Sequence, residues 1–212
     1  MNHYKLDLAT WNRKEHFEFY RRFDEPFHGI CIDIDCTSAY ETAKRNGSSF
    51  FLYYLHRSLV AVNEIEPFRY RIDGDSVGVC EKIHAAPTIG RDDGTFGFAF
   101  MEFKSDFEEF QLLAKPEIDR VRQGSGLMIS EKTGLPNTIH YSALPWISFT
   151  ALSHARSFSR PDSTPKISFG KIREVNGRRI MPVSIHVHHA LVDGYHVGQY
   201  VERFQQLMNE QE

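Results

Sequence analysis

Apolar side chains follow a helical period in two long segments of this chain. Residues 50–65 read FFLYYLHRSLVAVNEI, an apolar segment that begins after Ser48-Ser49 and stops before Pro67. Serine favours the start of a helix and proline its end, so we predict a helix here. The last segment carries an apolar stripe at helical spacing, which indicates a core or subunit contact. The stripe consists of Val197, Tyr200, Val201, Phe204, Leu207 and Met208.

Three shorter segments also have the pattern of amphipathic helices. They cover residues 11–22, 37–45 and 106–123. Thr37-Ser38 and Asp106 carry side-chain oxygens that accept hydrogen bonds from the free N–H groups of a helix start. Asn46-Gly47 ends the second helix, because these residues readily close a helix in the left-handed conformation.

Alternation of apolar and polar side chains predicts strands in the remaining segments. Residues 29–35, GICIDID, alternate isoleucine with Cys or Asp, which is the period of a half-buried strand. Asn176-Gly177 separates the last two predicted strands and is a strong hairpin signal. The other predicted strands cover residues 68–72, 77–80, 96–103, 139–149, 166–175 and 179–187.

Helix and strand patterns alternate along the chain without a repeat or a low-complexity segment. This alternation is typical of an α/β fold. The length of 212 residues suits one domain, so we expect residues 1–212 to form it. The longest irregular segments are 124–136 and 153–165, and we interpret the first as a site loop and not a linker.

Composition excludes several classes of protein. The formal charge of −3 and the absence of long basic runs argue against a nucleic-acid binder. Charged residues interrupt every apolar run well before the roughly 18 residues that span a bilayer. Residues 1–7 lack the apolar stretch of a signal peptide, and three cysteines, Cys31, Cys36 and Cys80, are too few and wrongly spaced for a disulfide framework or a structural zinc site. We therefore expect a cytoplasmic protein that binds neither nucleic acid nor membrane.

Histidine is abundant, with 11 in the chain. Four of them lie between positions 186 and 196, where the last strand meets the last helix. Strand alternation places His189 on the apolar face, where burial keeps an imidazole neutral and able to act as a general base. Two other interpretations stay open at this point: ordinary structural histidines, or a metal site formed by His186, His188 and Asp193.

Residues 188–196, HHALVDGYH, resemble the signature of the chloramphenicol acetyltransferase family. Three further segments resemble the family in the same order along the chain: 11–21, 142–149 and 165–171. The lipoamide-dependent acyltransferases and the condensation domains of peptide synthetases share the shorter H-x-x-x-D-G turn. Condensation domains are about twice this length, and no lipoyl or linker segment precedes the turn here.

The resemblance implies a two-layer α/β sandwich of the CoA-dependent acyltransferase type, with a mixed β-sheet covered by helices. It implies a homotrimer with active sites between subunits, acetyl-CoA as cosubstrate, no metal, and chloramphenicol or a similar small alcohol as acceptor. Two alternatives keep the same fold: an acetyltransferase for a different small hydroxylated acceptor, and a ligand-binding relative without turnover.

The resemblance also assigns the catalytic roles. His189 is implied as the general base and Ser142 as the donor to the thioester oxyanion. Ser168 stands where the family usually has a threonine that holds a water at the same site. Asp193 is expected to pair with Arg13 and to lock the turn that carries the base.

For acetyl-CoA, the resemblance implies contacts from Trp146 and Lys171. Two positions depart from the family: Ser49 stands where many members have a lysine, and Ile172 replaces an aromatic residue. We therefore expect the coenzyme to be bound more weakly or in a different arrangement, with the reaction class unchanged.

The acceptor pocket departs further from the family. Tyr20 and Phe96 match its aromatic positions, but the bulky Phe98 replaces a small residue. Leu152 and His154 stand where well-studied members have Phe and Leu. A polar His154 in an apolar pocket changes the shape of the pocket and the groups that an acceptor must satisfy.

Overall fold

A seven-stranded mixed sheet organises the protein, as seen in a computed structural model that describes residues 3–159 and 162–210. Its order is β2 (Phe27–Asp35), β10 (Arg178–His188), β8 (Lys166–Gly170), β7 (Thr138–Leu144), β5 (His84–Gly90) and β6 (Phe96–Phe98). The short β9 (Arg173–Val175) pairs with β10. Strand β7 runs parallel to β5 and β8, and the other pairs are antiparallel.

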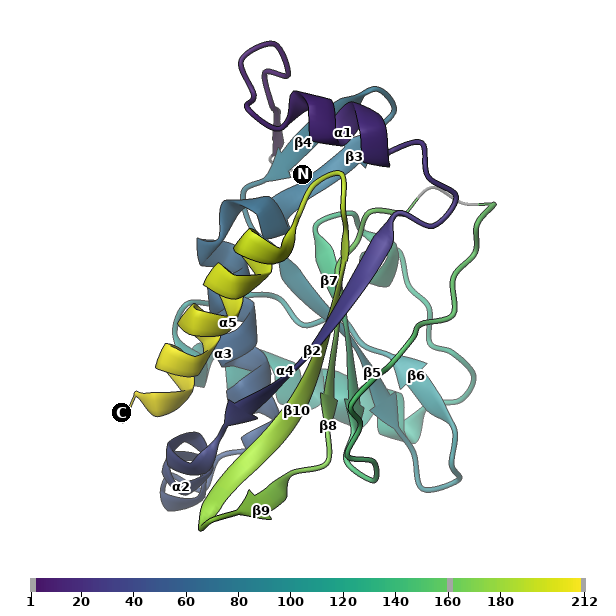
Figure 1. The fold of residues 1–212 in the computed structure, drawn as a ribbon. Helices are drawn as coiled ribbons and strands as arrows, with labels where there is room; N and C mark the ends of the chain where they lie inside the picture. The colour runs from purple at the N-terminus through teal and green to yellow at the C-terminus, as the bar shows by residue number, and fades with distance from the viewer. Residues whose placement is uncertain (1–2, 160–161, 211–212) are drawn as a thin grey trace.

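The helices gather on one face of this sheet (Figure 1). They are α2 (Thr37–Arg45), α3 (Phe50–Glu64), α4 (Phe107–Gln123) and α5 (Gly194–Asn209). Phe169 of β8 packs between Tyr54 of α3 and Phe204 of α5, with ring centroids 4.6 and 6.2 Å away. Burying these aromatic rings between sheet and helices contributes apolar contact that stabilises the two layers. The predicted mixed α/β architecture is thus confirmed.

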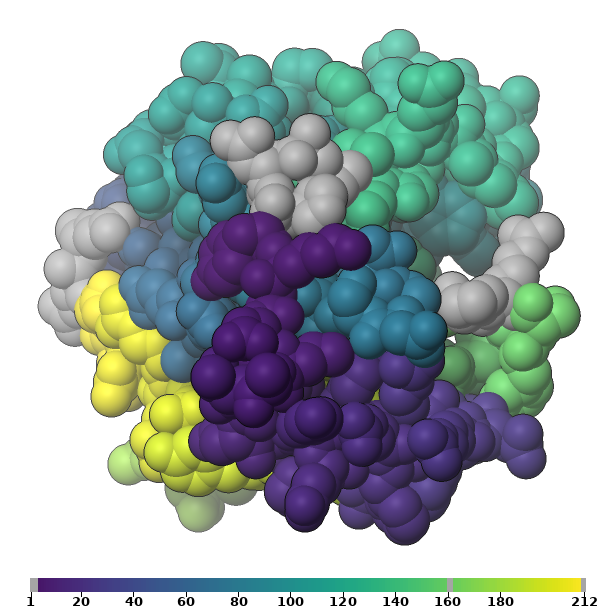
Figure 2. All heavy atoms as spheres, turned by 90° about the horizontal axis from the view of Figure 1, so that it is seen from above, coloured from purple at the N-terminus to yellow at the C-terminus, as the bar shows by residue number. Residues whose placement is uncertain are grey.

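A small three-stranded sheet caps one end of the molecule. It has the order β1 (His3–Lys5), β4 (Ser76–Cys80) and β3 (Tyr70–Asp73), preceded by a 3-10 helix, η1 (Glu66–Arg69). Helix α1 (Lys14–Tyr20) lies beside it, and Figure 2 shows the purple amino-terminal segment against the blue residues of this sheet.

Local sequence signals explain several of these boundaries. The Ser49 side chain accepts a hydrogen bond from Leu52 N at the start of α3, and Asp106 accepts one from Glu109 N at the start of α4. Asn176 and Gly177 both have positive φ, 51° and 75°, which is the turn geometry that fits the twist of the β9–β10 hairpin. The predicted helix boundaries and the predicted hairpin are confirmed at these places.

Other boundaries differ from the sequence prediction. Helix α1 is shorter than 11–22, and the strand predicted over 96–103 ends at Phe98, because Phe98 N bonds to Leu127 O in place of a strand partner. The predicted cap of α2 is wrong: Cys36 is the N-cap, and the Asp35 carboxylate accepts the hydrogen bond from Thr37 N. The strand predicted over 139–149 ends at Leu144.

Some elements had no clear local signal. Strands β1 and β5 were not predicted, and Phe68 lies in η1 and not in a strand. The segment predicted over 166–175 is two strands, β8 and β9. The irregular segment 124–136 holds a short 3-10 helix, η2 (Lys132–Gly134), and residues 160–161 of the second predicted loop lie outside the described residues.

None of the helices in the described part of the chain is long and apolar enough to cross a membrane.

A buried arginine ties the small sheet to the large one. The Arg71 guanidinium, only 5% exposed, donates to four backbone oxygens: Phe68 O, Tyr70 O, Pro136 O and Thr138 O, at 2.6 to 2.9 Å. Burial lowers the pKa of Arg71 to about 10, which still leaves it charged at pH 7.

We predict that Arg71→Met lowers the free energy of unfolding by about 3–5 kcal/mol, because it leaves buried carbonyl oxygens without donors. Urea denaturation followed by circular dichroism measures the change. Arg178, whose side chain is 72% exposed, is the matched control. We expect Arg178→Met to change the stability by less than about 0.5 kcal/mol, and equal losses in both variants would contradict the prediction.

Candidate active site

The face of the large sheet that carries no helices is polar. Side chains that pair directly across neighbouring strands share a face. His140, Lys166 and His186 form one such row across β7, β8 and β10. One face of the sheet is apolar and covered by helices, and the other is polar and free of helices. The polar side chains that could take part in a reaction therefore lie on one side of the sheet only.

A row of hydroxyl groups crosses this polar face. Ser142 of β7 pairs with Ser168 of β8, which pairs with Ser184 of β10. Thr88 of β5 extends the row, with its hydroxyl 3.5 Å from that of Ser142. Ser168 is fully buried, and its hydroxyl has no hydrogen-bond partner among the described residues. An unpaired buried hydroxyl is costly, so it marks a place where a ligand, a second chain or water completes the site.

The loop between β7 and β8 crosses the polar face. Its His154 ring packs edge-on against His186, with centroids 4.7 Å apart. Its Arg156 stacks over the Phe27 ring at 3.8 Å and pairs with Glu25. These contacts hold the loop over the end of β2 and place Leu152 and His154 on the sheet.

Gly29 of β2 makes room for the His186 ring. A Cβ atom at position 29 would lie 2.3 Å from His186 Nε2, so only glycine allows this approach. The His186 Nδ1 atom also lies 3.2 Å from the Ser184 hydroxyl. His186 is therefore a fixed part of the sheet surface that supports the loop.

His189 lies in the turn between β10 and α5. Its backbone N–H donates to Pro26 O, and its ring stacks on Tyr20 at 3.9 Å, with an interplanar angle of 23°. The buried Nδ1 atom has no hydrogen-bond partner within residues 3–159 and 162–210. The imidazole is thus held by packing, while one of its nitrogens is left unpaired.

Asp193 links this turn to the beginning of the chain. Its carboxylate caps α5 by accepting from Tyr195 N and His196 N, and it pairs with the Arg13 guanidinium. Arg13 also donates to His189 O at 3.3 Å. Partial burial opposes ionisation, but the His196 and Arg13 side chains lower the pKa of Asp193. The structure thus forms the Arg13–Asp193 pair, and it fixes the backbone of the histidine turn from two sides.

Three residues beside His189 were missed by the sequence analysis. The His28 ring lies 4.5 Å from the His189 ring, and its Nε2 atom lies 3.3 Å from Val192 O. Phe19 and Phe23 form an exposed aromatic cluster with Tyr20. The signal for His28 is its pairing with Val187 across the sheet, which a single sequence does not reveal.

Within one chain, His189 and Ser142 lie far apart. Ser142 is in register with Ser184, two strands away, and His189 follows Ser184 by five residues. Strand geometry converts this offset to about 16 Å along the strands and about 10 Å across them. The expected base and the expected oxyanion donor of the same chain are therefore not brought together.

The expected acceptor residues are divided in the same way. Tyr20 lies against His189, and Leu152 and His154 lie on the loop over β10. Phe96 and Phe98 belong to β6, at the opposite edge of the sheet from β2. A single chain thus does not bring the expected acceptor residues together.

The two expected coenzyme residues are also separated. Trp146 is 74% exposed and lines a pocket of about 830 Å³ between α3, α4 and the end of β5. Lys171 follows β8, where its N–H donates to Ile147 O, and it does not line this pocket.

The three residues considered as metal ligands have separate partners. His186 faces His154, His188 Nδ1 accepts a hydrogen bond from Ala190 N, and Asp193 pairs with Arg13. Among the described residues, no three His, Cys, Asp or Glu side chains are grouped as metal ligands would be.

Comparisons with known proteins agree on one family. The family model described as chloramphenicol acetyltransferase matches residues 1–205. Chloramphenicol acetyltransferase 3 of Escherichia coli is 28% identical over 99% of this chain and 98% of that protein. A chloramphenicol acetyltransferase of Bacillus pumilus is 32% identical over 90% of this chain and 86% of its own. A solved structure of a chloramphenicol acetyltransferase superposes with a TM-score of 0.89 at 30% identity, covering 97% of this chain and all of the other.

We predict that the protein loses stability as the pH falls from about 6.5 towards 4. Burial lowers the pKa of His154 and of His188 to about 4, so the folded protein keeps both neutral. The unfolded chain binds protons near pH 6.5, and this difference favours unfolding at lower pH. Urea midpoints measured between pH 7.5 and 5 give the slope.

The variant His154→Leu should have a smaller loss of midpoint over this range. His16, which is exposed, provides the control. His16→Leu should follow the wild-type slope, and a His154→Leu slope equal to the wild-type slope would refute this explanation.

Proposed function

The chain belongs to the chloramphenicol acetyltransferase family, and we propose that it transfers the acetyl group of acetyl-CoA to a hydroxyl of chloramphenicol. The observation that carries this proposal is the turn after β10, where His189 packs against Tyr20 and the Arg13–Asp193 pair holds the backbone. The ring stacking on Tyr20 and the hydrogen bonds to the His189 backbone hold the imidazole on a rigid support, as a general base requires.

The reaction begins with proton transfer to His189. Its imidazole takes the proton of the acceptor hydroxyl as the hydroxyl oxygen attacks the thioester carbonyl of acetyl-CoA. The C–O bond forms, the carbonyl oxygen becomes negative, and the imidazole becomes positively charged. Collapse of the intermediate breaks the C–S bond, and the departing thiolate receives the proton from the imidazolium. No acyl-enzyme is needed.

Ser142 stabilises the negative oxygen of the intermediate by donating its hydroxyl hydrogen. One such donor is typically worth about a hundredfold to a thousandfold in rate. The adjacent hydroxyl of Ser168 supports the same site, since it is buried and lacks a partner among the described residues.

Arg13 and Asp193 act as positioning residues. The Asp193 carboxylate is shared between the N-terminus of α5 and the Arg13 guanidinium, and Arg13 also binds His189 O. This arrangement keeps the turn from moving when His189 becomes charged. In this mechanism Asp193 does not transfer a proton.

The active site is completed by a second chain, in a homotrimer of single-domain subunits. The separation of His189 from Ser142 by about 16 Å along and about 10 Å across the strands supports this assignment. The polar sheet face, free of helices, supports it too, and so do the exposed aromatic rings of Phe19 and Phe23. His189 of one subunit then faces Ser142 and part of the acceptor pocket of its neighbour.

We predict that the purified protein releases free thiol from acetyl-CoA when chloramphenicol is added. His189→Ala should reduce the rate by about 10²–10⁴-fold, because the general base is lost. Ser142→Ala should reduce it by about 10²–10³-fold. A thiol reagent followed by absorbance measures both.

Ser76→Ala is the control, because Ser76 lies in the small sheet and outside the hydroxyl row. It should keep near wild-type activity. If thiol is released only with an alcohol other than chloramphenicol, that alcohol is the acceptor. This result would agree with the departures from the family at Phe98 and His154. No transfer to any alcohol would leave only a ligand-binding relative.

We also predict that two inactive variants restore each other's activity when they assemble together. Random assembly of equal amounts of His189→Ala and Ser142→Ala chains should recover about one quarter of wild-type activity, because each mixed trimer has one intact site. Co-refolding followed by the thiol assay measures the recovery, and light scattering checks the trimer. An active protein that shows no recovery on mixing would place the whole site within one chain.

A further inference from the structure

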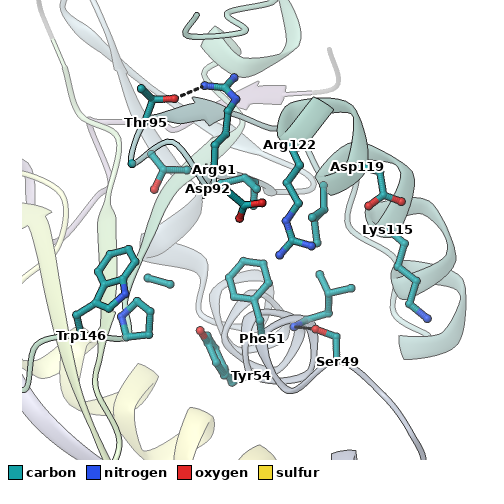
Figure 3. Close-up of a pocket in the computed structure, with 18 residues that line it drawn as sticks. Ser49, Phe51, Tyr54, Arg91, Asp92, Thr95, Lys115, Asp119, Arg122 and Trp146 are labelled. Atoms are coloured by element: carbon teal, nitrogen blue, oxygen red, sulfur yellow. Dashed lines mark hydrogen bonds between the residues drawn. The ribbon is translucent and has the colours of Figure 1, made fainter. Parts of the chain in front are cut away.

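The pocket lined by Trp146 has a positively charged wall. Figure 3 shows it between the exposed Trp146 ring on one side and helix α4 on the other, with Phe51 and Tyr54 of α3 beneath. Its volume of about 830 Å³ is within the range of cofactor sites. Lys115 and Arg122 of α4, together with Arg91, line it opposite Trp146.

Arg122 differs from Arg91 in having no hydrogen-bond or ion-pair partner among the described residues. Arg91 is committed to the fold, because it donates to Val121 O, Thr95 Oγ1 and Gly126 O. Arg122 makes no hydrogen bond or ion pair with any described residue, and its guanidinium extends into the pocket above Phe51 (Figure 3). Arg122 is an exposed residue that lines the pocket, and a guanidinium in such a position is suited to bind an anion with two parallel hydrogen bonds.

The surrounding charges also favour an anion. The pocket lining includes three cations, Arg91, Lys115 and Arg122, and two carboxylates, Asp92 and Asp119, which leaves a net positive charge in the pocket. The first turn of α3 opens into the same space through Ser49 and Phe51, and its N–H groups add a positive partial charge. Position 49 itself is a serine and supplies no cation.

The opposite end of the pocket reaches the proposed reaction centre. Thr88 and Ala143 line it there, and the Thr88 hydroxyl lies 3.5 Å from that of Ser142. A molecule with a thioester at one end and phosphates at the other would therefore extend from Ser142 towards α4.

We propose that Arg122 binds a phosphate group of acetyl-CoA, an assignment that rests on the proposed function. The guanidinium supplies the charge that Ser49 lacks, and Trp146 covers the coenzyme from the other side. Arg122 is thus a coenzyme-binding residue of this chain and takes no part in the acetyl transfer itself.

The test compares CoA binding to Arg122→Gln and wild type by calorimetry, which needs no turnover. Arg122→Gln should weaken CoA binding by about 10–100-fold, as expected for a charged hydrogen bond, and raise the KM for acetyl-CoA with little change in kcat. Arg120→Gln is the matched control, because Arg120 lies on the same helix, pairs with Glu117 and does not line the pocket. It should bind CoA like wild type. Urea denaturation checks that both variants are folded.

Shorter ligands identify the phosphate. If Arg122→Gln and wild type bind 3′-dephospho-CoA equally well, Arg122 binds the 3′-phosphate. If the two proteins bind equally well only when the ligand is pantetheine, Arg122 binds the diphosphate. Either result supports the proposal. A loss that persists with pantetheine, or unchanged CoA binding in Arg122→Gln, overturns it. Tight CoA binding without acetyl transfer to any alcohol would instead overturn the proposed function.

Discussion

The hydrogen-bonded register of β7, β8 and β10 is the constraint on which the proposed site depends. It fixes Ser142 opposite Ser168 and Ser184, and His189 can only follow at the end of β10. All three strands are buried in the main sheet, so no loop movement shortens the separation. In the proposed homotrimer, a second copy brings the base to this hydroxyl row across the sheet face that is polar and free of helices.

A second constraint connects the two ends of the chain. Asp193 starts α5 and pairs with Arg13, which precedes α1, so the orientation of the His189 turn depends on the amino-terminal segment. Arg71 of the small sheet in turn binds Pro136 O and Thr138 O at the start of β7, and so holds the two sheets together. A region that looks peripheral in Figure 1 is therefore part of the support of the proposed base.

Local signals predicted much of the fold, and long-range pairing explains what they missed. Helices α3 and α4 and the β9–β10 hairpin follow from Ser49, Asp106 and Asn176-Gly177, whose side chains or φ angles act on their own neighbours. The predicted strand over 96–103 failed because the partner of Phe98 N is Leu127 O, far along the chain.

The residues of the candidate site also separate into those that the sequence predicted and those that depend on long-range contacts. The resemblance supplied His189, Arg13 and Asp193, but alternation within β10 does not reveal what pairs with it, so His28 was missed. The proposed role of Arg122 cannot be predicted from the sequence either, because it depends on which other arginines, such as Arg91, are already bonded in the fold.

The separation of functions over different elements lets binding change while the chemistry stays. The proposed base and its support lie in the turn after β10, just before α1 and at the start of α5. The proposed coenzyme wall belongs to α4, and the expected acceptor residues belong to the β7–β8 loop and β6. Replacing a side chain at position 49, 98 or 154 touches none of the backbone hydrogen bonds that set the register. Selection for another acceptor, or for another way to bind the coenzyme phosphates, can therefore change the side chains that line the proposed binding sites and leave the strand register unchanged.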